Sequence, residues 1–492
     1  MNQSIMLLIP IFLPILAGIG LLLIPEIKKR EKLLAIVAFF LFATGAFVVN
    51  AVLNCNSEVT LFHLTKTMPI YFKIDAIGKL FVSIVSIIWI LVGIYSFVYM
   101  KHEKEEKRYF GFYLITFGIL VGLDFSSNLV TMYFFYECMT ILSVPLVIHN
   151  KSREAVMAGL KYLFYSFCGA YMALFGLFFL SKYTTTWSFV PGGVLDMAAV
   201  QGHENLILVV AFFMIMGFGV KAGMFPLHAW LPAAHPVAPA PASAALSSII
   251  VKSGVLAIIR VVYFMIGADF LKGSWVQYVW MSLALLTVFI GSMLAYKESV
   301  LKKRLAYSTV SQVSYILFGL ALMNPIAMTG ALLHVVFHAF IKSTLFLVAG
   351  AIIYQTGRTK VEQLSGIGKE MPVTIWCFTI VSLGLIGIPP LSGFISKWYL
   401  AIGSLQSEIM VYAWLGPVIL LVSALLTAGY LLPITIKGFL PGNEFDYTQV
   451  KKLEPSKLMV IPIMILTILT ALLGIMPNGL IQYITQTIAP LL

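Results

Sequence analysis

The chain has 492 residues, of which 60% are hydrophobic and only 11% are charged, and its mean hydropathy is +0.97. Soluble globular domains are nearer half apolar and a quarter charged, so this composition excludes an ordinary soluble fold. It predicts an all-α polytopic membrane protein, because apolar segments of about 20 residues cross a bilayer as helices.

We expect about fourteen transmembrane helices. Their approximate ranges are 4–25, 33–53, 74–99, 109–124, 128–148, 156–181, 206–224, 239–264, 275–296, 304–322, 327–354, 372–390 continuing as 391–404, 411–436 and 458–480. The N-terminal run lacks the basic segment of a signal peptide, so we expect a first helix and not a cleaved leader. Four regions follow: residues 1–108 with helices 1–3, 109–264 with helices 4–8, 275–436 with helices 9–13, and 458–492 with helix 14 and the C-terminus.

The formal net charge of +12 comes from basic residues in alternate loops. The odd-numbered loops between the predicted helices hold 21 Lys and Arg residues, and the even-numbered loops hold four. The positive-inside rule then places the odd loops in the cytoplasm and both termini on the outer side of the cell (plasma) membrane. The basic charge is therefore explained by topology, and no nucleic-acid partner is expected.

Cofactor motifs are missing from the sequence. The four cysteines are widely spaced, and there is no Gly-rich nucleotide loop and no Fe–S or haem cysteine pattern. We therefore expect no cofactor and no metal in this chain, and we assign any redox chemistry to partner subunits.

Two acidic positions are of interest. Asp75 and Lys79, four residues apart at the outer end of helix 3, are expected to form a local ion pair.

Glu137 is the only acidic residue that we place deep in a span. An ionised carboxylate there costs several kcal/mol unless a cation or hydrogen-bond donors face it, so we expect it to pair with a lysine. A neutral carboxyl group or a helix-packing contact is the alternative.

Four lysines lie inside predicted spans: Lys221, Lys252, Lys342 and Lys397. Lys161 and Arg260 lie nearer the ends of their helices and are expected to reach the surface. Lysine suits proton transfer because a buried ammonium group can release its proton, whereas arginine stays charged. The buried lysines therefore indicate a path for protons or other ions.

Helix 11 carries His334, His338 and Lys342 at intervals of four residues, which places them on one stripe. A protonatable stripe facing a hydrated interior is the favoured interpretation, and a metal site or ordinary core histidines are the alternatives. Helix 10 adds Ser311 and Gln312, which could let water into the helix. The basic residues at its start are interpreted as a cytoplasmic flank.

Two similar segments interrupt long apolar runs: GMFPLHAW (Gly223–Trp230) and GIPPLSGF (Gly387–Phe394). Pro226 in the first and Pro389 and Pro390 in the second break helices 7 and 12, which a membrane tolerates where the freed carbonyls face a cavity or polar groups. His228 is expected to be a supporting polar group in the first break. The breaks lie five predicted helices apart, so helices 4–8 and 9–13 are predicted to be two inverted five-helix repeats.

Several of these motifs together carry a family resemblance: EC in helix 5, VKAGMFPLHAWLPAAHPVAPAPASA, the helix 8 lysine, LKKRLAYSTVSQ, HAFIKSTLF and PPLSGFISKW. Over about residues 70–440 the chain resembles the proton-conducting antiporter-like subunits of complex I, of Mrp-type cation/proton antiporters and of membrane-bound energy-converting hydrogenases. The resemblance implies a fourteen-helix fold with two inverted repeats, each forming half a channel, joined by a hydrated polar axis.

The resemblance also implies roles for individual residues. Matched by position, the proton-transfer residues are Glu137, Lys221, Lys252, His334, His338 and Lys397. Some family members carry glutamate at the last position. Lysine there is closer to the Mrp D type and to the largest complex I subunit, whose long lateral helix has no counterpart here. An Mrp-D-like or hydrogenase subunit is therefore favoured.

We predict a proton-translocating subunit of a multisubunit membrane complex. Its partners would be other membrane subunits of that complex, a peripheral redox arm in some complexes, and the lipid bilayer. Two alternatives stay open: a stand-alone secondary transporter for sodium or a solute, and a non-conducting scaffold subunit. Transport by the purified single chain would favour the first, and tolerance of neutral substitutions at Glu137 and Lys252 the second.

Overall fold

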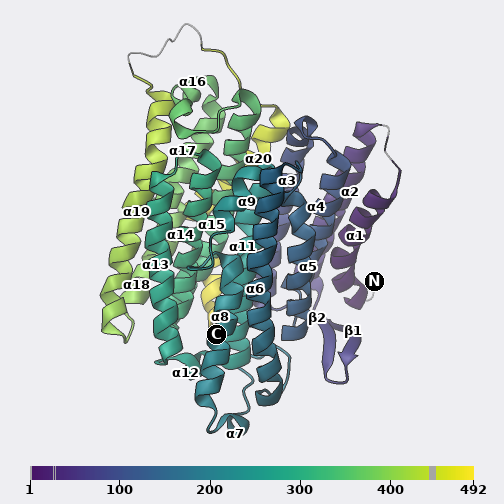
Figure 1. Ribbon diagram of the computed structural model, residues 1–492, viewed down its shortest axis with the longest axis vertical. Helices are drawn as coiled ribbons and strands as arrows, with labels where there is room; N and C mark the ends of the chain where they lie inside the picture. Colours follow the sequence, from purple (N-terminus) through teal and green to yellow (C-terminus); the bar gives the residue numbers. More distant parts are fainter. Residues whose placement is uncertain (1–2, 26, 28, 443–449, 492) are drawn as a thin grey trace.

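The computed structural model describes residues 3–25, 27, 29–442 and 450–491 as a bundle of roughly parallel and antiparallel helices (Figure 1). Within these residues, eleven helices are long and apolar enough to cross a membrane. The long helices are α1 (Gln3–Leu23), α2 (Arg30–Asn54), α3 (Ala76–Tyr99), α4 (Glu106–Asp124), α5 (Leu129–Val147), α6 (Arg153–Tyr183), α8 (Glu204–Ala222), α13 (Trp275–Lys297), α14 (Leu301–Ala321), α15 (Pro325–Thr356), α17 (Pro372–Ile386), α18 (Ser392–Leu405), α19 (Met410–Phe439) and α20 (Lys457–Ile475). The predicted helical membrane protein is confirmed.

Short polar side chains begin several of these helices. Asn128 accepts a hydrogen bond from the Thr131 amide at 2.7 Å at the start of α5, and Asn324 accepts one from the Ala327 amide at 2.9 Å at the start of α15. The first amides of a helix have no partner within the helix, so such a side chain satisfies one of them. These caps set the depth at which α5 and α15 present their polar residues.

A β-hairpin precedes α3 and departs from the predicted all-α fold. Strand β1 (Glu58–Thr65) pairs antiparallel with β2 (Met68–Lys73), with Glu58 opposite Lys73. The hairpin projects from the lower end of the bundle in Figure 1, where backbone hydrogen bonds tie β2 to the connection between α4 and α5. Strand β1 is mostly exposed and lacks the one-sided apolar pattern of a half-buried strand, whereas β2 buries the alternate residues Ile70 and Phe72.

Helix α15 runs through the centre of the bundle and is buried over nearly its whole length. It packs against α3, α10 (Ala240–Ala245), α14, α17, α18 and α20. By contrast, α1, α2, α13 and α19 expose large apolar side chains, as expected for helices that face lipid or a neighbouring subunit. The residues of α15 are therefore shielded from the bilayer by other helices.

Two helices stop and restart inside the bundle. Helix α8 ends at Ala222 and the chain resumes helical structure in α9 (Leu231–Val237), so Pro226 and His228 lie between them. Helix α17 ends at Ile386 and α18 starts at Ser392, with Pro389 and Pro390 between them. Gly223 (φ 77°) and Gly387 (φ 96°) close the first member of each pair in the left-handed conformation that glycine adopts most easily.

The segment predicted as a single helix 8 is irregular. It consists of α10, a π-helical turn at Leu246–Ile250, α11 (Val251–Ile259) and a second π-helical turn at Arg260–Ile266. A π turn widens the helix and changes the hydrogen bonding of its carbonyls, which is frequent at functional sites. Sequence periodicity does not reveal such turns, because all the residues remain buried.

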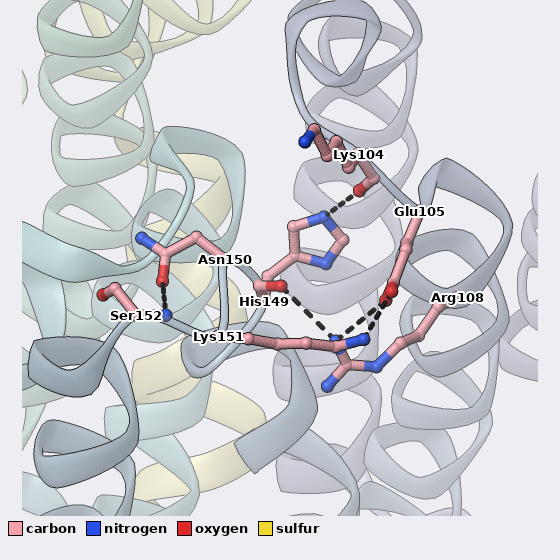
Figure 2. A network of polar contacts seen from close by, with 7 residues as sticks. All are labelled: Lys104, Glu105, Arg108, His149, Asn150, Lys151 and Ser152. Carbon is pink, nitrogen blue, oxygen red and sulfur yellow. Dashed lines mark hydrogen bonds and ion pairs between the residues drawn. The ribbon is translucent and has the colours of Figure 1, made fainter.

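Polar contacts at the opposite end from the hairpin join α4 to the turn between α5 and α6 (Figure 2). Glu105 forms an ion pair with Lys151 and accepts a hydrogen bond from Arg108 Nη1 at 3.3 Å. His149 Nε2 contacts the Lys104 carbonyl oxygen at 2.8 Å, which requires the proton on Nε2. The network fixes α4, α5 and α6 relative to one another, and α5 and α6 carry the polar groups described next.

Candidate functional site

Lys221 lies in the last turn of α8, and its side chain is fully buried. Its ammonium nitrogen donates hydrogen bonds to Thr140 Oγ1 on α5 at 2.9 Å and to Tyr162 OH and Ser166 Oγ on α6, both at 3.0 Å. The three N–H bonds of the ammonium group thus have three hydroxyl acceptors. Hydroxyl groups can also donate, so the same pocket can hold a neutral amine.

Glu137 lies one helical turn before Thr140 on α5 and is half-buried. The expected pairing of Glu137 with a lysine is not a direct contact in the described structure: Lys221 binds the three hydroxyls, and Glu137 Oε1 is buried without a hydrogen-bond partner among the described residues. The two charges still attract each other over a longer distance. Lys221 binds the hydroxyls because α5 and α6 place three of them around its ammonium nitrogen.

Lys252 lies at the start of α11 and is 3% exposed. Its ammonium nitrogen donates to the Ser247 carbonyl oxygen at 2.8 Å, within the first π-helical turn. Nearby, Gly254 packs against α8, where an added Cβ would lie 2.6 Å from the Phe218 carbonyl oxygen and 3.1 Å from Lys221 Cβ. This close approach brings the helices that carry the first two lysines together.

The stripe predicted on helix 11 lies on α15 and is buried. The His334 and His338 rings are stacked with centroids 5.8 Å apart, and His334 Nδ1 contacts Ser396 Oγ on α18 at 2.9 Å. His334 Nε2 and both His338 nitrogens have no partner among the described residues, which suits an interior that takes up water or protons. Lys342 donates to the Leu305 carbonyl oxygen at 3.0 Å.

Lys397 lies on α18 beside the second helix break. Its ammonium nitrogen donates to the carbonyl oxygens of Leu385 at 2.6 Å and Ile386 at 2.9 Å, the last residues of α17. The carbonyls at the end of a helix have no partner within the helix, so the lysine satisfies two of them. It also lies 5.1 Å from the Tyr315 ring, which stacks on His334.

The supporting residues predicted from the sequence divide into two groups. Gln312 and His228 have buried polar atoms without partners among the described residues, consistent with contact to water. Ser311 instead donates to the Val288 carbonyl oxygen at 2.9 Å and contacts Ser292 Oγ at 2.8 Å, so it joins α14 to α13. The part of the chain that the structure describes contains no group of three His, Cys, Asp or Glu residues that could hold a metal.

Three expectations about charged residues are wrong. Asp75 pairs with Arg260 and not with Lys79, and Arg260, expected to reach the surface, is only 2% exposed. Lys302, expected in a cytoplasmic flank, is 6% exposed and donates to the carbonyl oxygens of Pro236 and Ala238. These errors arise because tertiary packing brings in partners that are distant in the sequence.

Sequence reasoning also missed buried titratable groups. His235, in α9, is fully buried and stacks on Phe346, and neither ring nitrogen has a partner among the described residues. The sequence could have indicated His235, because this residue lies in a proline-dense segment that precedes the buried Lys252. Asp124, at the end of α4, is 3% exposed. Its predicted position at a helix end gave no sign of this burial.

The buried groups form two connected sets. Glu137 and Lys221 make the first set, and Lys252, Lys342, His338, His334 and Lys397 interact electrostatically as the second. The helices α8 and α11, which carry Lys221 and Lys252, touch at Gly254. A helical membrane bundle with lysines and histidines buried along its interior is typical of proteins that move ions across membranes.

Comparison with known proteins identifies the family. Residues 126–427 match the family described as "NADH:quinone oxidoreductase/Mrp antiporter, TM", and residues 64–110 match "NADH-Ubiquinone oxidoreductase (complex I), chain 5 N-terminus". The first match covers more than half of the chain, so the protein belongs to this family of antiporter-like membrane subunits. The resemblance inferred from the motifs is confirmed.

Individual relatives agree with this assignment. The chain is 29% identical to the NADH-quinone oxidoreductase subunit N of Desulforudis audaxviator, over 99% of this chain and 98% of the relative. It is 29% identical to the D-type subunit of the Na(+)/H(+) antiporter of Bacillus subtilis, over 100% of this chain and 98% of the relative. Its fold matches a chain in the structure of the Mrp complex from Dietzia sp. with a TM-score of 0.85 at 22% identity, covering 100% of this chain and 98% of that chain.

Proposed function

We propose that this chain moves protons across the membrane as an antiporter-like subunit of a multisubunit complex. The observation that carries the proposal is the fully buried Lys221, whose ammonium group is held by three neutral hydroxyls. Glu137 lies one helical turn before one of these hydroxyls, that of Thr140, on α5. Burying an ammonium group without a directly bound counter-ion costs several kcal/mol, so its retention calls for a function.

In the proposed mechanism a proton rests on Lys221, and the negative charge of Glu137 helps to hold it there. When a neighbouring subunit weakens that attraction, desolvation favours the neutral amine and the proton moves across the α8–α11 contact to Lys252. It then passes along Lys342, His338 and His334 to Lys397. The hydroxyl pocket assists because it solvates Lys221 in both protonation states.

The finer architecture belongs to the same proposal. We place fourteen spans in two inverted repeats, helices 4–8 (109–264) and 9–13 (275–436), between helices 1–3 (1–108) and the C-terminal region (458–492). The interruptions at Gly223 and Gly387 support this symmetry, because each is followed by prolines and a second helix. We place both termini on the outer side of the plasma membrane.

Partner subunits are also proposed. The relatives are named as subunits, and the structural match is a chain of a complex. Exposed apolar side chains on α13 and α19 support contacts with lipid or with neighbouring membrane subunits. A peripheral redox arm would be supplied by a complex of the oxidoreductase kind.

The test uses membrane vesicles that contain the assembled complex. Glu137→Ala and Lys221→Ala should abolish proton translocation while the complex still assembles. Lys161→Ala is the matched control, because Lys161 is an exposed lysine on α6. Wild-type proton translocation by Lys221→Ala would refute the proposal and favour a scaffold role.

A further inference from the structure

Asp124 is a buried carboxylate that the proton path described above does not use. It is the last residue of α4 and is 3% exposed, and its Oδ2 atom has no hydrogen-bond partner among the described residues. The C-terminal end of a helix carries partial negative charge, which disfavours an anion. A carboxylate kept only for structure would have donors around it, so this position calls for another explanation.

Asp124 shares a small cavity with Lys252. The cavity is also lined by Ser248 and Ser253 and is otherwise apolar, and its volume is about 10 Å³. Such a space is at the lower limit for one water molecule. Asp124 and Lys252 thus border one small space, in which a single water molecule could link them.

Beyond Asp124, polar groups continue towards the end of the bundle that carries the hairpin. Arg260, two turns after Lys252, donates from Nη2 to Asp75 Oδ1 at 2.8 Å and also attracts Asp124 electrostatically. The side chain of Asp75 is 28% exposed. The start of α3 touches the end of α4, since a Cβ on Gly78 would lie 2.5 Å from the Asp124 carbonyl oxygen.

We propose that Asp124 accepts a proton from Lys252 and passes it to the hairpin end of the bundle, past the Arg260–Asp75 pair. This inference rests on the proposed function. It adds a second outward route, which leaves the proposed proton path at Lys252 in the first half of the chain. In the transfer an N–H bond of the Lys252 ammonium breaks and an O–H bond forms on Asp124, through the bridging water. The products are a neutral amine and a neutral acid, and the acid then releases its proton to water at the bundle end. Arg260 stays charged throughout and supplies the fixed positive charge that the Asp124 carboxylate needs.

The first test measures proton translocation by the assembled complex in vesicles. Asp124→Asn removes the proton acceptor with little change in shape and should slow translocation about twofold, because the route to Lys397 stays open, whereas Asp124→Glu should retain more of the rate. Asp269→Asn, at an exposed acid on α12 (Ala268–Leu271), is the matched control. A wild-type rate in Asp124→Asn would overturn the branch. If Lys221→Ala abolishes translocation in the same assay, the proposed function survives that result.

The second test begins with the unmutated complex, so its first result does not depend on the folding of a variant. Infrared difference spectra, recorded while the membrane is energised, should contain a carboxylic acid band that shifts when the protein carries ¹³C-labelled aspartate. The band should be missing in Asp124→Asn and present in Asp269→Asn. Spectra without an aspartic acid band would exclude protonation of Asp124 and overturn the proposal.

Discussion

At the scale of single residues, the lysines of the site differ in their partners. Lys221 donates to side-chain hydroxyls, whereas Lys252, Lys342 and Lys397 donate to backbone carbonyls. A carbonyl only accepts hydrogen bonds, whereas a hydroxyl can reverse its role when the lysine loses its proton. Lys221 therefore has the pocket best suited to changes in its charge.

Tyr162 tests this pocket. Its hydroxyl group contacts Lys221 Nζ at 3.0 Å and Ser143 Oγ at 2.8 Å. A hydrogen bond to a charged group contributes about 1.5–3 kcal/mol, so Tyr162→Phe should slow proton translocation about tenfold or more. Tyr171→Phe is the control, because Tyr171 is an exposed tyrosine on the same helix. Equal rates for the two variants would show that the hydroxyl is dispensable.

His149 makes a separate prediction about pH. Burial lowers the pKa of His149, which lies in the turn between α5 and α6, below its ordinary 6.5. The folded state therefore binds fewer protons than the unfolded chain just below pH 6.5. The free energy of unfolding should fall as the pH falls through this range and should be unaffected above it.

The measurement is thermal unfolding of the detergent-solubilised protein at about pH 7.5 and about pH 5.5, on either side of the histidine titration. His149→Gln should lose less stability on acidification than the wild type. His63→Gln, at an exposed histidine on β1, should behave like the wild type. Identical acid sensitivity of wild type and His149→Gln would contradict the prediction.

At the scale of elements, the irregular helices place the site. The sequence predicted the interruptions around Pro226 and Pro389, because proline removes a backbone donor and disturbs the preceding turn. It did not predict the π-helical turns on either side of α11, which contain no proline. One of these turns contains the Ser247 carbonyl that binds Lys252.

The contact of α8 with α11 depends on Gly254. A methyl group there would lie 2.6 Å from the Phe218 carbonyl oxygen and 2.8 Å from the Ala222 amide nitrogen, so the helices must move apart. Gly254→Ala should lower the free energy of unfolding by about 1–3 kcal/mol and slow proton translocation. Gly20→Ala on α1 is the control, because nothing lies within 4 Å of the added methyl group. Unchanged transport in Gly254→Ala would show that the close contact is not needed.

At the scale of the whole molecule, the two ends of the bundle are distinct. The hairpin and the start of α3 lie at one end, where Tyr483 OH donates to the Ala76 carbonyl oxygen at 2.9 Å. The end of α3 meets the end of α15 at the other, where the rings of Tyr99 and Tyr354 lie 5.9 Å apart. Most of the basic loops lie at this second end, which the positive-inside rule assigns to the cytoplasm.

This arrangement predicts which sites a membrane-impermeant maleimide reaches. In a background without the four native cysteines, Thr67→Cys at the hairpin turn should be labelled in intact cells. Thr359→Cys, just after α15, should be labelled only after the cells are permeabilised. The reverse pattern would invert the topology, and labelling of both in intact cells would contradict their placement on opposite sides.

The sequence by itself determined the membrane class, the family and most helix ranges, because these follow from apolar runs, prolines and motifs that are local in the chain. It also singled out the buried lysines and the histidine stripe, because charge inside an apolar run is visible without a structure. Only the tertiary structure decided the partners of these groups. Arg260 binds Asp75, 185 residues away, and Lys221 binds hydroxyls from α5 and α6 in place of Glu137. The reason is physical: a buried donor bonds to whichever acceptors packing brings within about 3 Å, and that choice depends on how distant helices meet.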